Sequence, residues 1–333
     1  MFGKREIVWV SAVFLFCVCL ISPPFPALRK KPRQTVHSFN SGSAQDYLER
    51  GNFYFYQGKY DLAIADYNQA IQIDSNYLHA YIALANVYAK QEKYQLAIIN
   101  YDQAIAIDPS NIDSYYRRGY YYFDNQKYEL AISDSTQIIK MKPDANDAYN
   151  LRAISYGEQG KDNLAIADLN KALQINNYYT YANHNRGNFY FEQEKYGLAI
   201  IDYSKVIEVN NYNSDAYLSR GNAYLAQKKY ELAIADYSKT IDLNSRNADA
   251  YHNRGTAYLE QKQYELAIAD YNKAIQLSPD AADTYNNRGN TYLEQKKYRL
   301  AIADYNQAKS LLISQGKITE AAEIEQTLKS LSQ

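Results

Sequence analysis

Apolar side chains recur at gaps of three and four residues along most of the chain, which is the spacing of one face of an α-helix. Between residues 248 and 281 they form two stripes, one ending at Leu259 and one running from Tyr264 to Ile275. The polar tripeptide Gln261-Lys262-Gln263 lies between the stripes and is long enough for a tight turn. The pattern therefore predicts two short helices packed antiparallel.

This two-stripe pattern repeats with a period of 34 residues and no insertion, giving eight units between residues 44 and 315. A small residue marks the first helix of each unit: Gly51, Ala85, Gly119, Ala153, Gly187, Gly221, Gly255 and Gly289. An alanine marks each second helix: Ala63, Ala97, Ala131, Ala165, Ala199, Ala233, Ala267 and Ala301. Small residues at both positions predict that the two helices approach closely. Pro109, Pro143 and Pro279 follow second helices, which proline cannot continue.

The chain thus resembles the tetratricopeptide repeat (TPR) family, which has the same period and the same small and aromatic positions. In the unit from 248 to 281, the residues at the family's positions are Tyr251, Gly255, Tyr258, Ala267, Tyr271 and Pro279. The resemblance implies an all-α fold, a right-handed superhelical solenoid of eight helix-turn-helix units whose first helices line a concave groove. Residues 316–333 contain an amphipathic stretch that we expect to cap the last unit.

The first 33 residues differ in kind, because a 15-residue apolar run from Ile7 to Ile21 is flanked by basic residues. As a helix this run would span roughly 22 Å, which is short of the ~30 Å hydrocarbon core of a bilayer. No small-residue cleavage site follows it. We expect an uncleaved membrane anchor, and the alternative is an export signal removed at an atypical site. The side of the membrane stays open, and residues 34–43 are predicted to be a linker.

Composition narrows the classes of partner and of chemistry. The net charge is −1, but residues 1–37 are basic and the remainder is acidic, so nucleic acid is not an expected partner. Both cysteines, Cys17 and Cys19, lie in the apolar run, so the repeats can hold no disulfide and no thiolate metal site. The four histidines show no metal-binding spacing, and we expect no cofactor.

Asparagine recurs on the first helices, and a side-chain amide can donate to and accept from the peptide groups of an extended chain. We name these residues the amide row: Asn52, Asn86, Asn185, Asn188, Asn222, Asn253, Asn287 and Asn290. Because the resemblance places first helices in the groove, the amide row is a candidate site for a polypeptide backbone. Tyr116, Tyr120, His184 and His252 are the candidates for contacting its side chains. The alternative is that these asparagines are only polar surface in a duplicated motif.

Two further rows of residues are predicted to be structural. Arg recurs on first helices and Asp on second helices in seven copies each, whereas catalytic carboxylates come as one local pair. We expect these rows to pair between helices or to face solvent. Most of the 37 tyrosines fall on four repeat positions and are expected to pack in the core.

Function follows from these observations. The family's carboxylate clamp, which grips chaperone tails, needs lysines in the groove, and this chain has Leu48, Ile82, Tyr116, Asn150, His184, Leu218, His252 and Asn286 there. We therefore expect no chaperone-tail binding. No phosphate-binding loop, nucleophile or metal motif indicates an enzyme. The sequence predicts a non-catalytic scaffold that binds a polypeptide segment at a membrane, and the alternative is a regulatory or assembly subunit of a membrane-associated enzyme complex.

Overall fold

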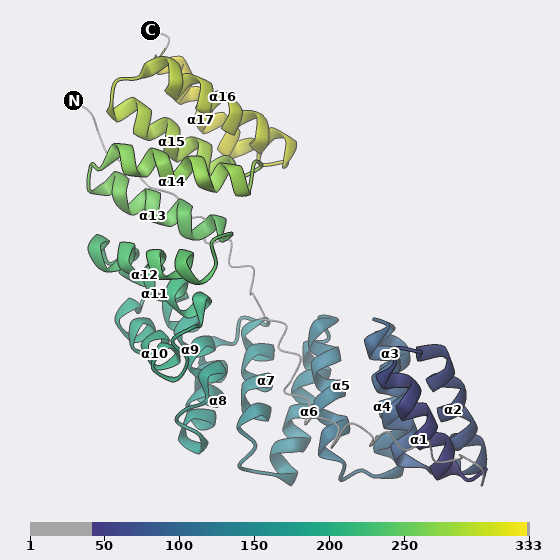
Figure 1. The fold of residues 1–333 in the computed structure, drawn as a ribbon. Coiled ribbons are helices and arrows are strands. Elements are labelled where there is room, and N and C mark those ends of the chain that lie inside the picture. Colours follow the sequence, from purple (N-terminus) through teal and green to yellow (C-terminus); the bar gives the residue numbers. More distant parts are fainter. Residues whose placement is uncertain (1–41, 332–333) are drawn as a thin grey trace. The chain divides into compact units, whose positions relative to one another are not determined.

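A computed structural model describes residues 42–331 of the chain. These residues form seventeen α-helices joined by short turns (Figure 1). The first helices of the units are α1 (Ala44–Tyr56), α3 (Leu78–Lys90), α5 (Ile112–Asp124), α7 (Asn146–Gly157), α9 (Thr180–Glu192), α11 (Ser214–Ala226), α13 (Ala248–Glu260) and α15 (Ala282–Glu294). The second helices are α2 (Tyr60–Ile73), α4 (Tyr94–Ile107), α6 (Tyr128–Met141), α8 (Asp162–Ile175), α10 (Tyr196–Val209), α12 (Tyr230–Leu243), α14 (Tyr264–Leu277) and α16 (Tyr298–Ser314). The last helix is α17 (Ile318–Leu331).

The described residues form two compact units, 42–182 and 183–331, each a stack of helix pairs. The predicted all-α fold of paired helices is therefore confirmed within each unit, whereas a superhelix continuous across both stays a prediction. The expected N-terminal anchor or signal lies outside the described residues. Across residues 42–331, no helix combines the length and the apolar character needed to cross a membrane.

The turn inside each helix pair requires one residue with a left-handed backbone. Gly58 and Gly160 supply it in the first and fourth pairs, with φ of 72° and 68°. In the other six pairs a non-glycine residue has φ between 56° and 60°: Glu92, Gln126, Glu194, Lys228, Lys262 and Lys296. The polar tripeptides between the stripes therefore form the predicted tight turns, and most of them tolerate a conformation that glycine adopts more easily.

Close approach of the two helices explains the small residues. A Cβ atom added at Gly221 would lie 2.7 Å from Cε1 of Tyr237, and the second-helix alanines are fully buried. The second-helix tyrosines that pack on these glycines and on Ala85 are themselves buried: Tyr67, Tyr101, Tyr203, Tyr237, Tyr271 and Tyr305. In the third and fourth pairs Ser135 and Leu169 take their place.

We expect Gly221→Ala to lower the free energy of unfolding by about 1–2 kcal/mol, because the new methyl group overpacks the ring of Tyr237. Unit two already holds Ala85 at this position with a buried Tyr101, so the ring can move enough to keep the fold. Gly197→Ala is the matched control, since Gly197 is exposed in α10 and its new methyl group meets only Nε2 of Gln227 at 4.0 Å. This control should raise the free energy of unfolding by up to about 1 kcal/mol. Urea unfolding would measure both variants. If the free energy of unfolding changes in the same direction in both, the explanation is contradicted.

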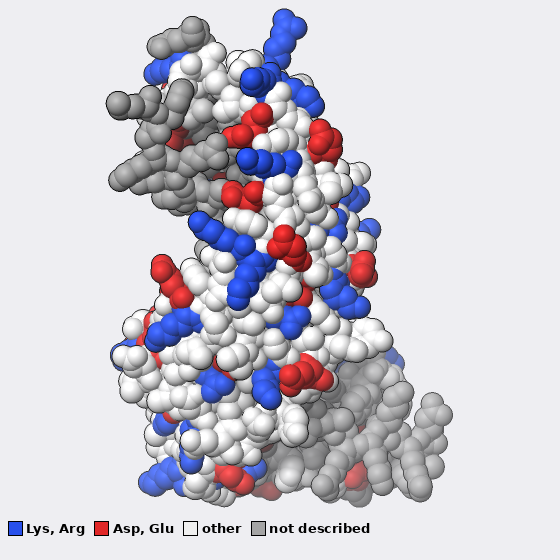
Figure 2. All heavy atoms as spheres, turned by 90° about the vertical axis from the view of Figure 1, so that its left-hand side faces the viewer, with Lys and Arg blue, Asp and Glu red and all other residues white. Residues whose placement is uncertain are grey.

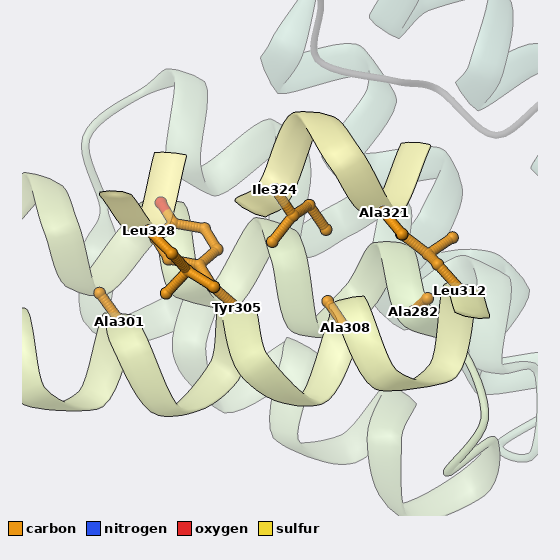
Figure 3. Close-up of a cluster of buried hydrophobic side chains, with 8 residues drawn as sticks. All are labelled: Ala282, Ala301, Tyr305, Ala308, Leu312, Ala321, Ile324 and Leu328. Carbon is orange, nitrogen blue, oxygen red and sulfur yellow. The ribbon is translucent and has the colours of Figure 1, made fainter. Parts of the chain in front are cut away.

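The C-terminal helix covers the last pair. Leu312, Ala321, Ile324 and Leu328 form one buried cluster with residues of α15 and α16 (Figure 3). The residues of α17 away from this cluster, among them Glu323, Gln326 and Lys329, are exposed. The last helix therefore has one apolar side on the stack and one polar side toward solvent, as expected for a cap.

Candidate polypeptide-binding face

The face formed by the first helices is held by arginine–aspartate pairs. In seven units an Arg on the first helix donates from Nε and Nη2 to the two oxygens of an Asp sixteen residues later on the second helix, as Arg220 does to Asp236 at 2.8 Å for both bonds. The other pairs are Arg50–Asp66, Arg118–Asp134, Arg152–Asp168, Arg186–Asp202, Arg254–Asp270 and Arg288–Asp304. The aspartates are nearly buried. The prediction of inter-helix pairing is confirmed.

Five of these arginines also join their helix pair to the one before it. Nη1 of Arg254 donates to Oγ of Ser238 at 2.9 Å, and Ser238 lies on the second helix of the preceding pair. Equivalent bonds run from Arg118 to Asp102 and from Arg220 to Ser204. Tyrosine rings on either side, such as Tyr251 and Tyr258 for Arg254, lie 5.7 and 6.0 Å from the guanidinium carbon. Bonding to Asp270 raises the pKa of Arg254 against the opposing effect of burial.

Five asparagines of the amide row accept a hydrogen bond from a buried tyrosine of their own unit. The hydroxyl of Tyr237 donates to Oδ1 of Asn222 at 2.9 Å. The same bond joins Tyr67 to Asn52, Tyr101 to Asn86, Tyr203 to Asn188 and Tyr305 to Asn290. This bond was not predicted from the sequence. The signal was present, because units three and four lack both the asparagine and the tyrosine, and in unit seven Thr256 replaces the asparagine and bonds Tyr271.

These bonds fix which side of each amide remains available. At Asn86 the guanidinium of Arg117, which can only donate, also points at Oδ1, at 3.3 Å. With Oδ1 engaged, the Nδ2 groups of Asn52, Asn188 and Asn290 have no bonded partner within residues 42–331. None of these three Nδ2 atoms is both buried and without a partner, so they reach solvent. The available groups of these three asparagines are therefore N–H donors.

The other three members of the amide row have different surroundings, because they contact a neighbouring unit or are partly or fully buried. Nδ2 of Asn253 donates to Oδ1 of Asn222 at 2.9 Å and so connects two successive first helices. Asn287 is 3% exposed, and its Nδ2 lies 3.4 Å from both Oγ1 of Thr256 and Nε2 of His252. Asn185 is half-buried on α9. The binding role of the amide row stays a prediction, and Asn287 has the least access to a ligand.

The two candidate histidines occupy equivalent places in α9 and α13. A ring nitrogen of His184 lies 3.3 Å from Oγ of Ser219, and Nδ1 of His252 lies 2.8 Å from Oγ1 of Thr284. Burial lowers the pKa of both imidazoles, and nearby carboxylates, Asp215 at His184 and Asp283 with Asp249 at His252, oppose that shift. Both rings are therefore mainly neutral at pH 7.

The two candidate tyrosines lie in the other compact unit. Tyr116 and Tyr120 are half-buried on α5, one turn apart. Burial raises the pKa of both hydroxyls, and the carboxylate of Asp147 on α7 adds to the effect. Tyr116 and Tyr120 thus form part of a face with α7, whereas His184 and His252 belong to residues 183–331.

These surfaces carry amide, aromatic and hydroxyl groups. Among residues 42–331, no group of three or more His, Cys, Asp or Glu side chains is arranged to hold a metal ion. On the molecular face drawn in Figure 2, basic and acidic side chains alternate with broad uncharged areas. A surface of mixed charge offers a phosphate backbone little net attraction. Amide donors, aromatic rings and half-buried hydroxyls are groups that contact peptides.

Fold and repeated rows together define a helix-turn-helix repeat protein. Profiles described as "TPR repeat" match residues 51–92, 85–126, 187–228, 221–262 and 255–296. Two described as "Tetratricopeptide repeat" match residues 282–312 and 116–180. The chain belongs to the tetratricopeptide repeat family, whose members are typically non-catalytic scaffolds for protein–protein interaction.

Solved structures show the same fold. A tetratricopeptide repeat protein from Parabacteroides merdae superposes with a TM-score of 0.58 at 20% identity, covering 75% of this chain and 99% of that one. The C-terminal part of a TPR repeat-containing protein from Cytophaga hutchinsonii superposes with a TM-score of 0.58 at 20% identity, and the match covers 72% of this chain and 98% of that one. A chain of the Cut9–Hcn1 hetero-tetramer of APC/C superposes with a TM-score of 0.58 at 20% identity, and the match covers 88% of this chain and 56% of that one. No curated protein matches the chain.

Proposed function

We propose that this protein is a non-catalytic scaffold that binds an extended polypeptide segment along its first-helix faces. The observation that carries the proposal is the orientation of the amide row, because Asn52, Asn188 and Asn290 present N–H donors after their oxygens have bonded to tyrosines. Backbone carbonyls of an extended chain are acceptors that suit such donors. Recognition of this kind depends little on the sequence of the partner.

Location is a second part of the proposal. We propose that the apolar run from Ile7 to Ile21 tethers the scaffold to a membrane, so that the bound partner is brought there. The run lies outside the described residues, and its uninterrupted apolar character and the basic residues on both sides of it support the idea. Sedimentation of the full chain with membranes after carbonate washing should separate a tether from an export signal, because a cleaved protein would be soluble and shorter. Protease access in intact cells would give the side.

The binding face can be tested by photo-crosslinking from defined positions. A photoreactive amino acid would replace Tyr120 or Leu218 on first helices, and Leu130 or Leu232 on second helices as controls. The control leucines are 44% and 49% exposed, so they can be reached by any molecule that binds the opposite face. We expect polypeptide adducts from the first-helix positions in cells. Adducts only from the second-helix positions would contradict the proposal.

The amide donors themselves can be removed without removing the acceptors. Asn188→Asp and Asn290→Asp keep an oxygen for Tyr203 and Tyr305 but lose the N–H groups. We expect the pair to weaken binding of the crosslinked partner by about 1 kcal/mol per lost bond, measured as peptide affinity, with thermal stability nearly unchanged. Asn210→Asp and Asn244→Asp, at the ends of second helices, are the controls. Equal loss of affinity in both sets would show that added charge, and not the lost donors, is responsible.

A further inference from the structure

Leucine occupies the third position of every second helix and is exposed in all eight units. The exposed fractions lie between 41% and 50% for Leu62, Leu96, Leu130, Leu164, Leu198, Leu232, Leu266 and Leu300. The residue before each leucine is exposed as well, but it differs between units, as Gly197, Glu231 and Arg299 show. The units have therefore diverged at this surface while keeping an exposed leucine.

Each leucine belongs to an uncharged strip along its helix. Three residues further on, the exposed side chain is small or apolar in every unit: Ala65, Ile99, Ser133, Ala167, Ile201, Ala235, Ala269 and Ala303. Residues three, four and seven positions apart share one side of a helix. The leucine and the small or apolar residue therefore lie on the same exposed side, which we name the leucine strip.

Lysines flank the leucine strips in residues 183–331. Lys229 precedes Leu232 by three positions and Lys239 follows it by seven, so both share its side of α12. Helix α10 has the same two lysines, and α14 and α16 have one each: Lys195, Lys205, Lys273 and Lys297. In residues 42–182 three of the four units have glutamine at the later position: Gln69, Gln103 and Gln137. The later lysine is thus more frequent in residues 183–331.

The second-helix side of residues 183–331 is net positive. Outside the first helices, residues 193–316 hold twelve Lys and Arg against ten Asp and Glu. Four of these ten are bonded to first-helix arginines: Asp202, Asp236, Asp270 and Asp304. Glu208 lies 3.6 Å from Lys205, whereas Lys195 and Lys273 bond to neutral glutamines and keep their charge. A surface of leucine and lysine suits a partner that is both anionic and apolar.

The strips do not converge on a groove. Helix α11 packs against α13 and α13 against α15, whereas no two successive second helices of residues 183–331 pack comparably. Successive strips therefore lie apart, so a single bound peptide segment would not match them well. A second copy of this surface would bring two positive faces together. A bilayer can take up leucines that lie apart, and its anionic headgroups attract the lysines between them.

We propose that the second-helix side of residues 183–331 binds the surface of an anionic membrane. Leu232, Leu266 and the other leucines of the strips enter the boundary between headgroups and acyl chains, and the flanking lysines pair with lipid phosphates and carboxylates. Binding of this kind requires no helix that crosses the bilayer. It uses none of the candidate polypeptide-binding residues, which lie on first helices, and it does not depend on the N-terminal tether.

The test uses the full chain in vesicles of phosphatidylcholine alone or mixed with phosphatidylserine. A photoreactive amino acid replaces Leu232 or, as the control, Leu218 on α11, and the N-terminal run is the same in both. We expect lipid adducts from position 232 to be at least tenfold more abundant on the anionic vesicles at low salt and to fall as salt rises. Position 218 should give few adducts on either. Leu266, which is 49% exposed, provides a second position should the first variant fold poorly.

The lysines can be replaced by a residue that other units already have. The test variant copies the glutamines of residues 42–182: Lys205→Gln, Lys239→Gln, Lys273→Gln. The control variant removes the same charge from the tight turns: Lys228→Gln, Lys262→Gln, Lys296→Gln. Gln126 already occupies such a turn with φ of 58°, so both variants should fold. We expect the test variant to lose most lipid adducts from position 232 and the control variant to keep most of them.

Three results would overturn the proposal. Equal loss in the two triple variants would mean that total charge is responsible. Equal adducts from positions 232 and 218 would mean that lipid contact is not specific to the leucine strips. Polypeptide adducts in place of lipid adducts from position 232 in cells would show that an acidic protein covers this surface. The first-helix crosslinks test the proposed function separately, so the two proposals can fail independently.

Discussion

Replacing Asp236 by Ala is expected to lower the free energy of unfolding by about 3 kcal/mol, near the lower end of values for breaking a buried ion pair. The reason is that Arg220 would keep its charge among the rings of Tyr217 and Tyr224 while losing both bonds to the carboxylate. The side chain of Arg220 is 20% exposed, so water can compensate only in part. Hydrogen exchange of α11 and α12 would locate the loss, and urea unfolding would measure it.

Unit two supplies the control for this prediction. It has Leu84 and Asn100 at the positions of the arginine and the aspartate, so both members of the ion pair are replaced in the same unit. Leu84 is buried, and Nδ2 of Asn100 donates to the backbone oxygen of Leu96 at 2.8 Å, so no charge is left unpaired. The double variant Arg220→Leu, Asp236→Asn should therefore recover most of the lost stability. A double variant as unstable as Asp236→Ala would refute the explanation.

Stability should also fall steeply above pH 10. Burial raises the pKa of Tyr67, Tyr101, Tyr203, Tyr237, Tyr271 and Tyr305 above the ordinary value of 10.0. Above that pH the unfolded chain loses these protons while the folded chain keeps them, so the folded state is disfavoured increasingly until the pH reaches the folded-state values. Each tyrosine should cost about 1.4 kcal/mol per pH unit in this range.

The measurement is urea unfolding at a series of pH values between neutral and strongly alkaline. Tyr237→Phe lacks one titrating hydroxyl, so its loss of stability with pH should be less steep than that of the unchanged chain. At neutral pH the same variant should be less stable, because it loses the bond to Asn222. Tyr212→Phe is the control, since Tyr212 is 77% exposed and its removal should leave the slope as it was. An unchanged slope in Tyr237→Phe would contradict the prediction.

Local features of this fold could be predicted from the sequence because each arises from residues in one or two units. The helix pairs follow from apolar spacing, and the close approach of Gly221 to Tyr237 follows from the recurring small residue. Pairing between the arginine row and the aspartate row was among the expectations from the sequence. The two bonds from Arg220 to Asp236 and the bond from Nη1 of Arg220 to Ser204 were not predicted. A helical period gives the side of a helix but not which polar neighbour a long side chain reaches.

The candidate site was harder to predict for the same physical reason. Asn188 and Asn222 were predicted to face a ligand, and the structure gives their oxygens to Tyr203 and Tyr237. An amide has a donor and an acceptor side, and only the three-dimensional neighbours decide which one remains.

Every hydrogen bond discussed above joins residues at most 35 positions apart, the widest being those of His184 with Ser219 and Asn287 with His252. Contacts of such short range form quickly and require little closure of long loops. A helix pair can therefore form the hydrogen bonds described above as soon as one more repeat has left the ribosome. The protein should consequently fold during its own synthesis, from the first repeat onward, without waiting for its C-terminus.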